Sequence, residues 1–557
     1  MSNDFEFSRG LLQLTGFFQR LQVWIDRSVF DLVRQMRLSY VPPMMIYLAA
    51  GVSGLTGIVG TFFVKDYLGL TAEFLATLGF WAMMPWAMKM PIGHLVDLLW
   101  RHKAKIIYLG AALIAASLLI MLNLITSANS MSSRLSVETW FVVATLLAPI
   151  GYVIQDTVAD AMTVEAVSRF DEDGKPIPVE QIQLAHTTMQ TLGRVAIIGG
   201  TLIVALANVY LFRDVANMDA PAQAAIYVQI YRWALVIPVI SVFGVFLAAY
   251  LRSNQEWRLA AQGYEFEDID RLLARPNELP DIDWRILVGS LSFTFFAVVM
   301  GISNVPYNEE LIFAGSLSIV LFLMWHLTNE LSSSDKKQLF GTALVIFAFR
   351  AVPTTGAGST WWMIDELGFD QAFLSKLSLI SSSLTLFGMV LFRRYLSERS
   401  ITDIIITLTV TFTVLNLPEI ALFYGFHEWT QAHIANFIDA RFIALVDTAL
   451  ESPLGQIAMI PILAWIANSA PPQLKATYFA VMAALINLAL SLSQLLTKLL
   501  NQQFVITREI KNTVTGVVSV PADYSQLGGL FFTVMLLGFA LPILTIYIAN
   551  RTLLSER

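Results

Sequence analysis

The chain has 557 residues, of which 56% are hydrophobic and only 14% charged, and it contains no cysteine. Soluble domains carry about 25% charged residues, so the composition excludes an ordinary soluble protein and indicates an all-α polytopic membrane protein. The formal net charge of −7 provides no basic surface for nucleic acid. The lack of cysteine excludes disulfides and thiolate metal sites.

Residues 8–38 precede the first long apolar run, which begins near Val41, so we expect no cleavable signal peptide. Apolar residues recur here at helical spacing, and Arg20, Arg27 and Arg34 fall between them. This pattern predicts a cytoplasmic amphipathic helix, within residues 1–40, that lies on an anionic membrane surface. The alternative is a helix that docks a partner protein.

Windows of about 20 residues predict fourteen membrane spans. They lie at residues 41–64, 72–96, 105–126, 138–166, 183–210, 225–251, 284–303, 308–330, 338–362, 371–393, 401–425, 438–468, 475–500 and 527–550. Lysine and arginine concentrate in alternate connections, the first of which holds Arg101, Lys103 and Lys105. This bias predicts that both termini are cytoplasmic, in a bacterial inner membrane or another plasma membrane.

An internal repeat divides the chain into two halves. Residues 68–78 align with residues 367–377, and Leu78 and Leu377 differ by 299 positions. Asp156 and Asp447 align in the same order at a similar spacing. The alignment predicts an N-terminal six-span half (41–251), a cytoplasmic linker with two inserted spans (252–337) and a C-terminal six-span half (338–557). Two parallel repeats around a central axis are typical of secondary transporters.

Two pairs of carboxylates occupy equivalent places in this repeat. Asp156 and Asp160 lie four residues apart and therefore share one face of the fourth span, and Asp447 and Glu451 repeat the spacing in the twelfth. A carboxylate at membrane depth costs roughly 2.5–3.5 kcal/mol on insertion scales, so it normally faces a cavity or a partner. We expect these acids to bind cargo or carry protons; the alternative is that they only brace Arg194 or Arg350 in structural salt bridges.

The ninth span carries Arg350 just before Pro353, Gly356 and Gly358, which predict a broken helix. Such a break frees backbone groups for a ligand where it lines a cavity. Arg350 is a candidate to bind an anion here. Trp361 and Trp362 would stack on a flat ring or, as we favour, lie in the aromatic belt.

The end of the second span predicts a gate. Gly93 would allow close helix contact, and Asp97, followed by Arg101, would meet the N-terminus of a helix from the other half, beginning near Pro471. The alternative is an ordinary charged loop. The sequence has no phosphate-binding Gly-x-x-x-x-Gly-Lys-Ser/Thr loop and no His-Glu-x-x-His, so we expect a transporter rather than an enzyme, without metal or cofactor.

At these motifs the sequence resembles the folate–biopterin transporter family of the major facilitator superfamily. The matching residues are Pro85, Trp86, Lys89, Gly93 and Asp97; the acids Asp156, Asp160 and Glu165; and, in the C-terminal half, Asp439, Phe442, Asp447, residues 455–463, Pro472, Thr477 and Asn487. The resemblance does not cover the N-terminal helix or the inserted spans.

The resemblance implies a major-facilitator fold and transport of a folate or pteridine by alternating access, facilitated or coupled to protons. A carboxylate can accept the paired donors of a pteridine ring, and Arg350, Arg194 or Lys89 can hold the carboxylates of a folate tail. Two alternatives remain: a transporter of a different organic anion, and a non-transporting scaffold whose inserted spans or N-terminal helix bind a partner protein.

Overall fold

The computed structural model describes residues 34, 36–67, 70–87, 89–99, 102–167, 177–215, 218–265, 269, 284, 288, 295–296, 299–300, 305–328, 332–391, 399–454, 475–511 and 518–553. The predicted amphipathic helix lies outside them, apart from its last residues. In the described part the chain is almost entirely helical, which confirms the all-α prediction. The two six-span halves and the insert are those predicted from the repeat.

The N-terminal half contains η2 (Leu38–Tyr40), α3 (Val41–Val52), η3 (Ser53–Thr56), α4 (Gly57–Tyr67), α5 (Ala72–Ala87), α6 (Lys89–Leu98), α7 (Lys103–Ser132), α8 (Val137–Ala166), α9 (Val179–Phe212), α10 (Ala220–Ala234) and α11 (Val236–Ala261). The insert contributes α14 (Asn308–Leu327). The C-terminal half contains α15 (Ser333–Arg350), α16 (Ala357–Asp365), α17 (Gln371–Leu391), α19 (Ile401–Leu415), α20 (Leu417–Phe423), α21 (Phe426–His433), α22 (Ala440–Glu451), η6 (Ser452–Leu454), α24 (Lys475–Gln503), β1 (Ile510–Lys511), β2 (Val518–Val520) and α25 (Leu527–Thr552).

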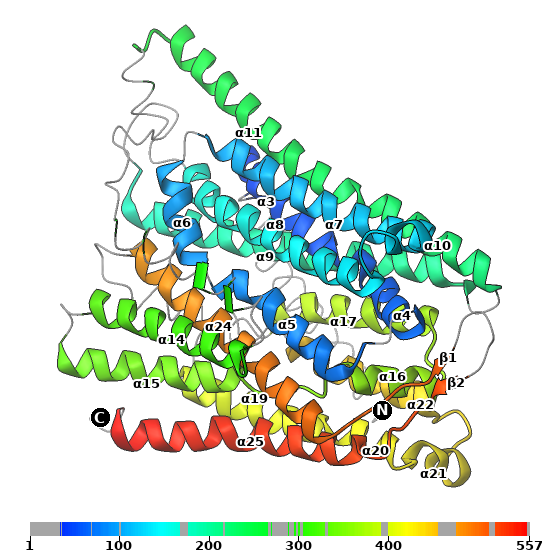
Figure 1. Ribbon diagram of the computed structural model, residues 1–557. Coiled ribbons are helices and arrows are strands. Elements are labelled where there is room, and N and C mark those ends of the chain that lie inside the picture. The colour runs from blue at the N-terminus through cyan, green and yellow to red at the C-terminus, as the bar shows by residue number, and fades with distance from the viewer. Residues whose placement is uncertain are drawn as a thin grey trace, which may run out of the picture.

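Nine helical segments among the described residues are long and apolar enough to cross a membrane. They establish an integral membrane protein, and the total of fourteen spans stays a prediction. The helices of the two halves form two groups, with the N-terminal half above and most of the C-terminal half below in the view of Figure 1.

The ninth span is broken as predicted. Helix α15 ends at Arg350, α16 begins at Ala357, and Gly356 adopts a positive φ of 73°, which glycine reaches without the steric penalty of a side chain. The backbone groups at this break are taken up by α24. Ser493 donates to the carbonyl of Val352 at 2.6 Å, and the hydroxyl of Thr497 accepts from the amide of Thr354 at 2.9 Å.

These bonds change the interpretation of the break. We expected its free backbone groups to serve a ligand, but side chains on one face of α24 satisfy those of Val352 and Thr354. The break is therefore a fixed joint that fastens the ninth span to α24.

Replacing Thr497 with valine should destabilise the protein by about 1–3 kcal/mol, because the part-buried amide of Thr354 would lose its acceptor while the side-chain volume is nearly kept. Thermal unfolding of the purified variant measures this. Thr407→Val is the matched control, since Thr407 is exposed and bonds only within its own helix. Equal losses in the two variants would contradict the proposed joint.

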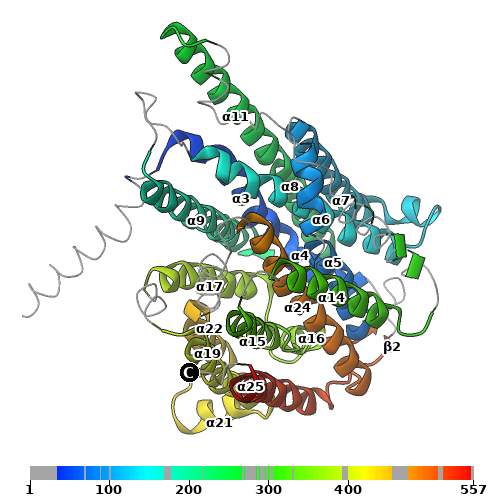
Figure 2. The same cartoon turned by 90° about the vertical axis from the view of Figure 1, so that its left-hand side faces the viewer.

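Helix packing between the halves is uneven along their length. Two helix pairs, α5 with α24 and α9 with α17, join the halves (Figure 2). At the end opposite the basic loops, one apolar cluster draws residues from both halves, among them Phe62, Tyr227, Trp361 and Phe373. At the basic-loop end the described residues form separate clusters for the two halves. Figure 1 shows the two helix groups diverging away from β1 and β2.

The insert helix α14 packs on the seam between α5 and α24, in a cluster with Phe80, Ile312 and Leu488. Near its N-terminus the Lys498 ammonium lies 3.1 Å from the Glu309 carboxylate and 3.6 Å from Glu310. Lys498 therefore ties α24 to the insert.

Candidate functional site

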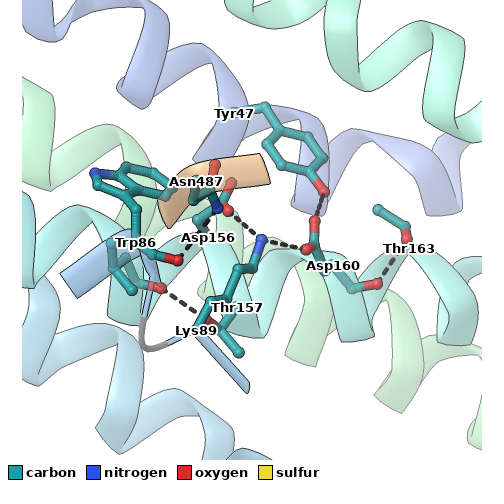
Figure 3. Close-up of polar contacts among 9 residues, drawn as sticks. Tyr47, Trp86, Lys89, Asp156, Thr157, Asp160, Thr163 and Asn487 are labelled. Atoms are coloured by element: carbon teal, nitrogen blue, oxygen red, sulfur yellow. Dashed lines mark hydrogen bonds and ion pairs between the residues drawn. The ribbon is translucent and has the colours of Figure 1, made fainter. Parts of the chain in front are cut away.

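A network of charged side chains lies where α3, α6 and α8 meet. The Lys89 ammonium, at the first residue of α6, is 2.5 Å from the carboxylates of both Asp156 and Asp160 on α8. The Tyr47 hydroxyl on α3 donates to the other oxygen of Asp160, also at 2.5 Å. Figure 3 shows Lys89 between the two carboxylates. We call Tyr47, Lys89, Asp156 and Asp160 the N-half charge cluster.

Local sequence explains this placement. The four-residue spacing turns both aspartates to one face of α8, as predicted. The second span is divided between α5 and α6, so Lys89 stands at the start of a new helical segment. Beside it, the Asn487 amide of α24 donates to the carbonyl of Trp86 at 3.2 Å. The cluster therefore borders the C-terminal half.

Its charges do not balance. Two carboxylates face one ammonium, and the side chains of Lys89 and Asp156 are each 16% exposed, whereas that of Asp160 is 39% exposed. Asp160 thus keeps access to the space beside the cluster. We considered Arg194 and Arg350 as the structural partners of these acids, but within the described residues the ion pairs go to Lys89 instead.

Arg194 and Arg350 form no ion pair with these acids in the described part of the chain, and each is influenced by other nearby charges. Arg194 of α9 and Arg350 of α15 come from opposite halves and lie close enough for their positive charges to repel. Arg194 also lies within electrostatic range of Asp156 and Tyr47. The Nε of Arg350 is buried and has no hydrogen-bond partner in the described part of the chain. Buried polar groups are normally satisfied, so this guanidinium is suited to an anion supplied from outside the protein.

The repeated acids of the C-terminal half lie in another environment. Glu419 of α20 is within electrostatic range of both Asp447 and Glu451 on α22, which places three acids near one another. The Oδ1 of Asp447 is buried without a hydrogen-bond partner among the described residues. The structure thus brings together Asp156, Asp160 and Lys89, and separately Asp447 and Glu451; no hydrogen bond or ion pair in the described part joins the two sets.

In the C-terminal half, Gly388 of α17 lies against η6, the turn that follows α22. A Cβ at Gly388 would collide with the backbone of Pro453, and neighbouring Thr385 donates to the carbonyl of Ser452 at 2.9 Å. Here the chain therefore packs backbone to backbone, and no lysine or arginine forms an ion pair with Asp447 or Glu451 among the described residues.

The predicted gate is only partly described. Gly93 lies against α8, where an added Cβ would meet Thr157 at an ordinary 3.9 Å. This contact does not require glycine. The side chain of Asp97, together with Arg101 and Pro471, lies outside the described residues, so the gate stays a prediction.

The tryptophan prediction was wrong. Trp361 and Trp362 are 2% and 5% exposed, and they pack in the apolar cluster shared by both halves rather than in an aromatic belt.

Sequence reasoning also missed Tyr47, because a tyrosine in an apolar span gives no signal that separates hydrogen bonding from packing. For Asn487, its place in the family pattern was the one sequence feature that could have marked it as a site residue.

Known proteins resemble this chain in sequence and in fold. Residues 288–555 match the BT1 family, so the expectation that the likeness leaves out the inserted spans was wrong. The chain is 23% identical over 449 residues to the folate-biopterin transporter of Synechocystis sp., covering 80% of this chain and 71% of that protein. Over 220 residues it is 23% identical to folate transporter 2 of Plasmodium falciparum, covering 36% of this chain and 46% of that protein.

Solved structures agree on the fold. A POT family transporter in complex with 5-aminolevulinic acid superposes with a TM-score of 0.58 at 11% identity, covering 92% of this chain and 96% of that one. A mutant of the nucleoside transporter NupG gives 0.50 at 10% identity, covering 92% and 100%. The fold is that of these transporters, and the named relatives support a membrane transporter. The sequence matches also confirm the predicted resemblance to the folate–biopterin transporter family.

Proposed function

We propose that the protein carries a folate or a pteridine across the membrane by alternating access, with proton coupling. The observation that supports this most directly is the buried Nε of Arg350, which has no hydrogen-bond partner in the described part, with the positive charge of Arg194 from the other half nearby. An anion bound between the two arginines would relieve their repulsion and draw the halves together. The glutamate tail of a folate supplies such carboxylates.

Roles for the other residues follow from their neighbours. Lys89 pairs with both Asp156 and Asp160, while the exposed part of Asp160 can accept donors from a pteridine ring. Asp447 and Glu451, with Glu419 nearby, have no cation paired with them in the described part and are the better candidates for proton coupling. Gly93, Asp97 and Arg101 remain the proposed gate. The basic loops would face the cytoplasm, together with both termini.

Uptake of labelled folic acid into vesicles tests this proposal. We expect uptake by the wild type to rise with an inward proton gradient, and we expect Asp447→Asn to lose that dependence. Asp156→Asn should lower uptake at every pH. Uptake no greater than that of protein-free vesicles would refute the folate cargo, and equal pH dependence in Asp447→Asn would refute the coupling role.

A different organic anion would also fit two arginines, and a ligand-stabilisation screen of the purified protein separates these cargoes. Thermal stabilisation by an unrelated dicarboxylate, and by neither folic acid nor biopterin, would favour that alternative. A co-purifying protein together with dispensable carboxylates would favour the scaffold.

A further inference from the structure

A two-stranded hairpin follows α24 at the end of the molecule opposite the basic loops. Its arms, Phe504–Lys511 and Val518–Gln526, pair through Ile510 with Val520 and through Lys511 with Val518. The backbones of Thr507 and Asp523 also exchange two hydrogen bonds, of 3.1 and 2.8 Å. This pairing fixes the first arm, which Figure 1 shows beside α16.

The first arm places a buried arginine between the halves. Arg508 is 3% exposed, and its guanidinium donates to the carbonyl of Val64 in α4 of the N-terminal half. The same guanidinium lies 5.1 Å from the ring centre of Trp361 in α16 of the C-terminal half. A carbonyl in the last turn of a helix carries partial negative charge, and an aromatic face attracts a cation, so both contacts favour arginine.

Two further contacts support this position. The Gln502 amide at the end of α24 donates to the Glu73 carboxylate of α5 at 2.7 Å, which is a second link between the halves. The Tyr524 hydroxyl of the second arm donates to Asp365 of α16 at 2.5 Å. Burial and the Asp365 carboxylate raise the pKa of Tyr524 above its ordinary value, so this phenol keeps its proton and stays a donor. The hairpin is thus fastened to the C-terminal half, while Arg508 reaches across to the N-terminal half.

We infer that this hairpin is a latch on the outer side, in which Arg508 holds the outer ends of the two halves together and must leave Val64 before the transporter can open outward. The inference rests on the proposed alternating access. It fits the apolar packing, which joins the halves at this end and is divided between them at the other.

Removing the charge should shift the conformational balance outward. Arg508→Gln keeps a polar side chain but loses both the cation and most of its reach. The chain has no cysteine, so spin labels at introduced cysteines report without background. One labelled pair, Ser133→Cys with Ala432→Cys, reports the distance between the outer ends of the two halves. A second pair, Asn254→Cys with Ser334→Cys, reports the distance between their inner ends. All four positions are exposed.

We expect Arg508→Gln to lengthen the outer distances and shorten the inner ones, and Arg508→Lys to produce a smaller change of the same sign. Arg213→Gln, which removes a 62% exposed outer arginine paired with its neighbour Asp214, should change neither. Wild-type distances in folded Arg508→Gln, or in Arg508→Lys if the glutamine variant does not fold, would overturn the latch. These distances need no cargo, so failure of folate uptake with a responsive outer pair would refute only the proposed cargo.

Discussion

Replacing Lys89 with methionine is expected to abolish uptake and to destabilise the protein by about 2–3 kcal/mol. Removing one partner of a buried ion pair costs about 3–5 kcal/mol, because the remaining charge is left without compensation. Here Asp160 is 39% exposed and partly screened by solvent, so the expected loss is smaller. Thermal unfolding and vesicle uptake of the purified variant measure the two effects.

A compensating change separates charge from packing. Adding Asp156→Asn to Lys89→Met removes one of the unpaired carboxylates and should restore at least half of the lost stability. Lys105→Met is the matched control, since Lys105 is exposed and near the start of α7. If the double variant is as unstable as Lys89→Met alone, the lysine acts through packing and not through its charge.

Replacing Arg350 with methionine should weaken cargo binding without destabilising the protein, in contrast to Lys89→Met. We expect affinity for folic acid to fall about 10- to 100-fold, the usual effect of losing charge-assisted hydrogen bonds worth about 1.5–3 kcal/mol. Stability without cargo should stay the same or rise, because the substitution removes a buried unpartnered donor and the repulsion by Arg194. Calorimetric titration and thermal unfolding without cargo measure the two quantities.

The two readouts also test the assignment of Arg350 to cargo binding. Arg194→Met should likewise weaken binding, and the double variant should gain no more stability than the better single variant, because each substitution already removes the repulsion. A marked loss of stability in Arg350→Met without cargo would show that the arginine supports the fold and not the ligand.

Much of the fold could be predicted from the sequence because apolar runs of membrane length and the repeat are properties of the chain itself. The break in the ninth span was predictable for the same reason, since Pro353 and Gly356 act on their own backbone. Its role was not, because Ser493 and Thr497 lie about 140 residues away in sequence and nothing local marks them as partners.

The site shows the same limit. The spacing of Asp156 and Asp160 predicted their common face, but their partner Lys89 follows a division between two helices, where helical periodicity no longer fixes direction. The aromatic-belt prediction for Trp361 was wrong for a related reason. Its position near a span end is typical of belt residues, yet the hairpin that carries Arg508 covers it.

Helix α24 meets three neighbours at once: α5, the insert helix α14, and the joint of the ninth span. Between Met482 and Asn501 only Leu499 is classed as exposed. This helix therefore has little direct contact with lipid, and it carries Ser491, Ser493, Thr497 and Lys498 into the membrane. This segment is long and apolar enough to span a membrane, but its Ser493, Thr497 and Lys498 side chains find partners on other segments of the chain. It should settle only when the earlier spans are already in place to receive it, which makes it a late step in assembly.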